Sequence, residues 1–170
     1  MIANENGAGR VPSVLSMIVR SALILCLLAL LLGPVCQVVP GATYGQEVLA
    51  AVLLAEARGE GESGMLAVGE VIRHRADQRG VSLLAVLRPG AFSSLNGVTR
   101  DELLRRYKHH PQFPMALEIA RTAYNQPDRL RNTTRDGTHF THKNEKPYWT
   151  SGHAPVATIG NHAFYRLPRF

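Results

Sequence analysis

The chain has 170 residues and a net charge of +6, with 45% hydrophobic and 19% charged residues. This composition excludes a chain that is disordered throughout, and it suits one domain of ordinary size whose core needs no disulfide or metal cross-links. The basic balance favours an anionic partner, but no nucleic-acid partner is expected because the basic residues are scattered and form no long run.

The N-terminus carries the pattern of an export leader. Ala22 to Leu32 is an uninterrupted apolar run, Arg10 and Arg20 precede it, and the next charged residue is Glu47. Positive charge before an apolar segment is typical of a signal peptide or of a signal-anchor helix. We therefore expect an exported protein of the periplasm or cell envelope, either cleaved from its leader or anchored through it in the inner membrane. A buried core helix is the remaining alternative for this run.

A change of composition divides the chain after the leader. The stretch from Gly33 to Thr43 contains two prolines and reads as a linker, which predicts a leader with linker over residues 1–42 and one domain over residues 43–170. Both cysteines, Cys26 and Cys36, lie in the leader. The domain therefore has neither a disulfide framework nor a thiol nucleophile.

The domain reads as mostly helical, with a small β- and loop-rich C-terminal part. Capping signals support the helices, with Ser63 as a candidate N-cap, Gly80 just past a helix end, and a capping box that begins at Thr99. The predicted helices are Tyr44 to Arg58, Gly64 to Arg79, Val81 to Leu87, Thr99 to Tyr107 and Pro114 to Asn125. The predicted extended segments are Thr138 to Thr141 and Ile159 to Tyr165. The fold class is therefore expected to be α+β.

Glu56 is the first candidate for chemistry. On a helical wheel it falls within the apolar arc of the first helix, and Glu47 and Arg58 fall opposite. That arc is formed by Val48, Leu49, Val52 and Leu53. Partial burial and the C-terminal end of a helix both favour the protonated form of a carboxylic acid, which is the form that a general acid for glycosidic bond cleavage requires. The alternative is a structural Glu paired with an Arg of a neighbouring helix.

Two other groups of charged residues favour structural roles. Glu60 lies between Gly59 and Gly61, so we expect a turn residue that bonds backbone amides or an Arg. On the second helix a polar group falls away from the apolar side and reads as a solvated or salt-bridged face. Its members are Glu70, Arg73, His74 and Asp77.

The C-terminal histidines allow a metal hypothesis. A zinc site can be drawn from His139, His142 and His162, but the sequence has no HExxH motif and the domain has no Cys ligand. No metal and no cofactor are therefore expected. The aromatic residues near Trp149 either stack on sugar rings or close a core.

Several segments in register resemble one known family, the SleB-type cell wall hydrolases. They are Leu54 to Glu60 (LAEARGE), Ala67 to Arg75 (AVGEVIRHR), Pro89 to Ser93 (PGAFS), Gly137 to Phe140 (GTHF), and Ile159 to Tyr165 (IGNHAFY). With Trp149, these elements span about Val48 to Arg166, which is nearly the whole domain. The chain departs from the family pattern at His74, where an Asn is common, and at Ala91, where a Gln is common.

The resemblance implies a lysozyme-like fold and cleavage of the glycan strand of peptidoglycan between N-acetylmuramic acid and N-acetylglucosamine. It implies a lytic transglycosylase in which Glu56 is the single catalytic acid, with Glu60 as a secondary or structural acid. The substrate-binding residues that it implies are Phe92, Ser93, His139, Phe140, Trp149, His162 and Tyr165. The expected partners are peptidoglycan and, through an uncleaved leader, the membrane.

Three alternatives remain open. A hydrolytic muramidase needs a second carboxylate, for which Glu60, Glu70 or Asp101 are the candidates. A zinc amidase would use the three histidines named above. A non-catalytic wall-binding protein would keep the fold without needing Glu56.

Overall fold

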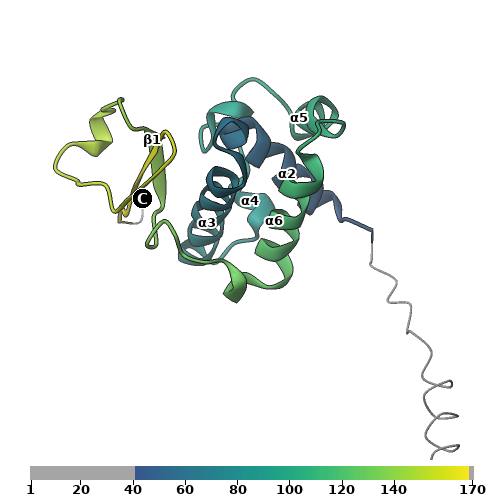
Figure 1. Ribbon diagram of the computed structural model, residues 1–170, viewed down its shortest axis with the longest axis horizontal. Helices are drawn as coiled ribbons and strands as arrows, with labels where there is room; N and C mark the ends of the chain where they lie inside the picture. The colour runs from purple at the N-terminus through teal and green to yellow at the C-terminus, as the bar shows by residue number, and fades with distance from the viewer. Residues whose placement is uncertain (1–40, 169–170) are drawn as a thin grey trace, which may run out of the picture. The chain divides into compact units, whose positions relative to one another are not determined.

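A computed structural model describes residues 41–168, which form an α+β unit as the sequence predicts. Its helices are α2 (Tyr44–Ala57), α3 (Gly61–Arg79), α4 (Leu83–Val86), α5 (Arg100–Tyr107) and α6 (Phe113–Asn125), and its strands are β1 (His139–His142), β2 (Ala157–Ile159) and β3 (His162–Tyr165). The helices gather into one layer, and the C-terminal sheet, drawn in yellow-green, lies to one side of them (Figure 1).

The predicted export leader falls on residues 1–40 and lies outside the described residues. Within residues 41–168, none of the helices combines the length and the apolar character needed to cross a membrane.

Helix α2 is the centre of the helical layer. It begins with a capping box in which Gln46 N donates to Thr43 Oγ1 (3.3 Å) and Thr43 N donates to Gln46 Oε1 (3.0 Å). Every residue from Val48 to Leu54 is fully buried, because α3, α5 and α6 pack around the helix. A helix that is apolar on all sides is typical of a buried position. The predicted apolar arc of α2 was therefore too narrow, because it covered only one side of the helix. The surrounding core fixes the last turn of α2, which carries Glu56.

Helix α3 joins the helical layer to the sheet. It begins at Gly61, directly after a short 3-10 turn at Arg58–Glu60, so the prediction of Ser63 as its N-cap was wrong. It ends as predicted at Arg79, and Gly80 just past the end has a left-handed φ of 65°. Ala67 and Val71 on this helix pack against Phe164 of β3. The sheet therefore rests on a helix that is itself fixed by the core.

The other helices begin close to their predicted residues. Ser82 accepts a hydrogen bond from Ala85 N (3.2 Å) and caps α4. Thr99 and Glu102 form the expected capping box of α5. Helix α6 has Pro114 in its first turn, where the absence of an N–H costs no hydrogen bond.

The sheet is antiparallel, in the order β1-β3-β2. His139 pairs with Tyr165, and His142 pairs with His162. The central strand β3 is the most buried of the three, with Ala163, Phe164 and Tyr165 all in the core.

Buried Glu70 of α3 holds the loop that leads into β1. Its carboxylate accepts hydrogen bonds from Thr133 N (2.9 Å), Thr134 N (2.8 Å) and Thr133 Oγ1 (3.1 Å). Glu70 has no exposed surface, so its predicted place on a solvated face was wrong. The backbone amides of the loop replace water as partners of the charge. Arg73 and Asp77, by contrast, form the expected exposed ion pair on the same helix.

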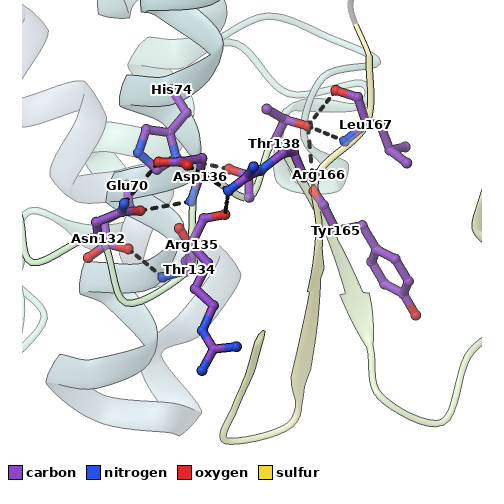
Figure 2. Close-up of polar contacts among 11 residues, drawn as sticks. Glu70, His74, Asn132, Thr134, Arg135, Asp136, Thr138, Tyr165, Arg166 and Leu167 are labelled. Carbon is purple, nitrogen blue, oxygen red and sulfur yellow. Dashed lines mark hydrogen bonds and ion pairs between the residues drawn. The ribbon is translucent and has the colours of Figure 1, made fainter. Parts of the chain in front are cut away.

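Further polar contacts fix the loop on both sides (Figure 2). Asp136 N donates to Asn132 Oδ1 (2.8 Å) within the loop, and His74 Nδ1 lies 3.1 Å from the Gly137 carbonyl oxygen. At the start of β1, Thr138 Oγ1 accepts a hydrogen bond from Leu167 N (3.0 Å). These contacts determine where β1 lies relative to α3.

Candidate active site

Glu56 lies half-buried in the last turn of α2, beside the loop that follows α4. Its carboxylate accepts a hydrogen bond from Ser94 N (3.0 Å), and Ser93 Oγ lies 3.4 Å from Oε1 and 3.5 Å from Oε2. The shorter bond from Ser94 N orients the carboxylate, and the Ser93 hydroxyl lies at the outer limit of hydrogen-bond distance. Within residues 41–168 Glu56 forms no close ion pair with an Arg, but its charge acts on Arg75 of α3, so the predicted structural alternative keeps a partner at longer range.

The Glu56 carboxylate faces a cavity of about 470 Å³ between the helical layer and the sheet. We call this the Glu56 cavity. It is lined by Ala55, Glu56, Arg75, Ala91, Phe92, Ser93, Phe140, Thr141, His142, Glu145, Pro147, Trp149 and His162. One wall therefore comes from α2, α3 and the loop after α4, and the other comes from β1, β3 and the segment between β1 and β2.

Arg75 connects these walls. Its side chain is buried, and it donates from Nε to the Thr138 carbonyl (2.5 Å) and from Nη1 to the Ala91 carbonyl (2.9 Å). The guanidinium lies over the Phe92 ring, 4.9 Å from the ring centre. Burial, together with the nearby charge of Arg79, lowers the pKa of Arg75 to about 10, so the group remains a cation at neutral pH.

Aromatic side chains form much of the opposite wall. The Phe140 ring lies 6.4 Å from that of Phe92 and 5.2 Å from that of His162, measured between centres. The Trp149 ring lies 5.4 Å from that of Tyr165, in an edge-on arrangement. Tyr165 is 7% exposed and belongs to neither cavity wall. It supports Trp149 from behind, so the structure does not place it with the other predicted substrate-binding residues.

A second cavity of about 380 Å³ adjoins the first. We call it the arginine cavity. It is lined by Arg75, Arg79, Arg88, Pro89, Gly90, Ala91, His139, Phe140 and Trp149. Four of these residues, Arg75, Ala91, Phe140 and Trp149, also line the Glu56 cavity. The two cavities therefore lie side by side, with Glu56 and Glu145 lining the first and Arg79 and Arg88 lining the second.

His139 lies in the arginine cavity and is held in its neutral form. Burial and the charges of Arg75 and Arg79 lower its pKa from 6.5 to about 4.

The low pKa of His139 predicts a pH-dependent stability. Because the unfolded chain binds the His139 proton more tightly, the free energy of unfolding should decrease as the pH falls from about 6.5 to 4. We expect a loss of the order of 1 kcal/mol, since solvent screens a half-exposed group. Urea unfolding at pH 7 and pH 4.5 gives the free energy of unfolding at each pH. Its decrease between the two pH values should be smaller for His139→Asn than for the unchanged chain, and an equal decrease would contradict the assigned pKa of His139.

The structure brings together most of the residues that the sequence singles out. Phe92, Ser93, Phe140, Trp149 and His162 line the cavity that Glu56 faces, and His139 lines the adjoining one.

Glu60 lies in neither cavity wall. Its side chain packs against Gly64 and against Gly160, where a Cβ atom would lie 2.6 Å from Glu60 Cγ. Glu60 lies in the turn at Arg58–Glu60, as predicted, but its side chain makes no hydrogen bond or ion pair to another described residue, so the predicted bonds to backbone amides or an Arg are not found. Its packing beside two glycines indicates a structural residue.

The histidines of the zinc hypothesis do not converge. His139 and His142 are three positions apart on β1, so their side chains point to opposite faces of the sheet. Within residues 41–168 there is no cluster of three His, Cys, Asp or Glu side chains that could hold a metal ion. The donor set therefore does not favour the amidase alternative.

The site also contains residues that sequence reasoning missed. Glu145 lines the Glu56 cavity, and its carboxylate accepts a hydrogen bond from Thr141 Oγ1 (2.9 Å). Of the acids considered as a second carboxylate, Glu70 is bound to the loop before β1 and Asp101 is bonded to the Tyr44 hydroxyl (2.7 Å). Glu145 lies in an irregular segment with no periodicity, and only its closeness in sequence to His142 and Trp149 pointed to it.

A carboxylate and aromatic rings lie together in the Glu56 cavity, an arrangement that suits an enzyme acting on a carbohydrate polymer. The chain belongs to the cell wall hydrolase family, whose sequence model matches residues 59–165 and confirms the resemblance described above. Glu56 lies just before the matched segment. No curated protein and no solved structure matches the chain. Family membership identifies a cell wall hydrolase that acts outside the cytoplasm, with peptidoglycan as its substrate.

Proposed function

We propose that this protein cleaves the glycan strand of peptidoglycan between N-acetylmuramic acid and N-acetylglucosamine by lytic transglycosylation, with Glu56 as the catalytic acid. The observation that supports this most is the placement of Glu56. It is a carboxylate oriented by Ser94 N in a cavity large enough for sugar rings and lined by Phe92, Phe140 and Trp149. We further propose that the chain is exported to the envelope by its N-terminal leader.

The proposed reaction needs one carboxyl group in two protonation states. Glu56 donates its proton to the glycosidic oxygen, and the bond from that oxygen to C1 of muramic acid breaks. The 6-hydroxyl oxygen of the same muramic acid then bonds to C1, and its proton passes to the Glu56 carboxylate. The products are a strand ending in 1,6-anhydromuramic acid and a strand with a free glucosamine 4-hydroxyl, and the acid is regenerated. Ser94 N remains as a donor to the carboxylate while the proton is away.

One observation favours a second candidate, a hydrolytic muramidase. Glu145 supplies the additional carboxylate in the same cavity that an inverting or retaining glycosidase requires. Its side chain is exposed and accepts a hydrogen bond from Thr141. In the transglycosylase the 6-hydroxyl replaces water as the nucleophile, so Glu145 is not needed for the reaction.

Product analysis separates the candidates. Purified sacculi are digested with the full chain, and the released fragments are identified by mass spectrometry. Anhydromuramyl ends are expected. Reducing muramic acid ends, lost on Glu145→Gln, would instead establish the muramidase. New amino groups with intact glycan strands would establish an amidase and contradict the proposal.

A further inference from the structure

We infer that the arginine cavity is a subsite for the carboxylates of the peptide stem carried by muramic acid, so that the enzyme prefers glycan strands whose stems are intact and acidic. This inference rests on the proposed function, because it names a part of the substrate of the same site.

The first argument is charge without a partner. The side chains of Arg79 and Arg88 line the arginine cavity, and neither makes a hydrogen bond or an ion pair with another described residue. Arg75, which lines the same cavity, adds a third cation, and it lies close enough to Arg79 for the charge of Arg79 to act on it. No Asp or Glu side chain lines this cavity. The charge of Glu56 acts on Arg75, whereas the exposed side chains of Arg79 and Arg88 have no acidic partner among the described residues, so an anionic ligand would supply a counter-charge for these two.

The second argument is the local field. The low pKa of His139 arises partly from Arg75 and Arg79, so their charges act directly at the cavity wall. The imidazole is neutral at pH 7 and can contact a ligand without requiring a counter-ion. Trp149, on the same wall, adds an apolar surface. A short peptide with carboxylates combines both kinds of group.

The third argument is position. The arginine cavity shares Arg75, Ala91, Phe140 and Trp149 with the Glu56 cavity, so an anion bound there lies next to the sugar being cleaved. The peptide stem is attached to that sugar through its lactyl group, and its free carboxylates extend away from the strand. Guanidinium groups match the geometry of both carboxylates and phosphates. A phosphate polymer linked through the muramic 6-hydroxyl, however, would block the ring closure of the proposed reaction, which favours the stem.

Trp149 makes the test direct, because it is the one tryptophan of the sequence and lines both cavities. Its fluorescence is followed during titration of full-length Glu56→Gln, which retains both cavities without turnover. The probes are a disaccharide tripeptide with free carboxylates, the same compound with its carboxylates amidated, and a glycerol phosphate oligomer. We expect the free acid to bind about tenfold more tightly than the amide, and to lose this advantage in high salt.

Charge removal supplies the matched comparison. Arg79→Gln with Arg88→Gln should weaken binding of the free acid about tenfold and leave binding of the amide unchanged. Arg131→Gln, an exposed arginine outside both cavities, should leave both unchanged. Two results would overturn the subsite: equal binding of the free acid and the amide, or a loss of free-acid binding in Arg131→Gln as large as that in the double variant. Tighter binding of the glycerol phosphate would overturn its assignment to the stem. Because binding is measured without catalysis, a failure of the proposed cleavage would appear in the product analysis and not here.

Discussion

Replacement of Glu56 by Gln is expected to lower the rate of glycan cleavage by about 10³-fold, which is within the usual contribution of a general acid. Gln has nearly the same shape as Glu, and its carbonyl oxygen can still accept the hydrogen bond from Ser94 N. The variant keeps the cavity but has no proton to donate. The rate is measured as release of soluble fragments from dye-labelled sacculi.

Two controls make this result specific. The thermal unfolding temperature of Glu56→Gln should stay within a few degrees of the unchanged chain, because its packing is preserved. Glu60→Gln, an acid outside both cavities, should retain most of the activity. If Glu56→Gln cleaved at more than a tenth of the original rate, Glu56 would not be the acid.

Replacement of Glu70 by Ala should destabilise the domain by about 3–5 kcal/mol, because a buried charge-assisted network is lost. The amides of Thr133 and Thr134 would lose their acceptor, and a fully buried site would be left empty. The loop would no longer hold β1 against α3, so activity should fall together with stability. Urea unfolding of the full chain gives the free energy difference.

Glu62→Ala is the matched control for this effect, since Glu62 is an exposed residue of the same helix. It should change stability by less than about 0.5 kcal/mol. The loss of stability in Glu70→Gln should lie between those of Glu70→Ala and Glu62→Ala. The amide keeps one acceptor oxygen, but its NH₂ group is a donor that faces the donating backbone N–H groups of the loop. A loss below about 1 kcal/mol in Glu70→Ala would contradict the anchoring role of this carboxylate.

Local signals in the sequence predict most of the secondary structure. The capping box at Thr99 and the glycine at position 80 mark helix ends that the structure confirms. The start of α3 was missed because Gly61, its first residue, has a positive φ of 65° and directly follows the turn at Arg58–Glu60. The pattern of two glycines around Glu60 reads as a helix stop, although it marks only a brief interruption. The lysozyme-like character of the fold stays a prediction.

Some residues of the candidate site could be predicted from local sequence patterns, and others could not. Glu56 was identifiable because helical periodicity placed a carboxylate among apolar positions, and family motifs pointed to the same residue. Glu70 was misjudged because a helical wheel shows the face of a residue but not the loop that covers it. Arg75 owes its place to contacts between segments far apart in sequence, such as the bond from Arg75 to Thr138, and Glu145 lines the cavity because the segment after β1 folds back beside Glu56. Such contacts leave no local pattern.

The most direct measurement is digestion of sacculi by the unchanged full chain in water enriched in ¹⁸O, followed by mass spectrometry of the muramic acid ends. Closure by the 6-hydroxyl uses no water, so the account predicts anhydromuramyl ends without ¹⁸O, and none of these ends from Glu56→Gln. Incorporation of ¹⁸O at C1 of muramic acid, or anhydromuramyl ends from the Glu56→Gln chain at the original rate, would contradict it.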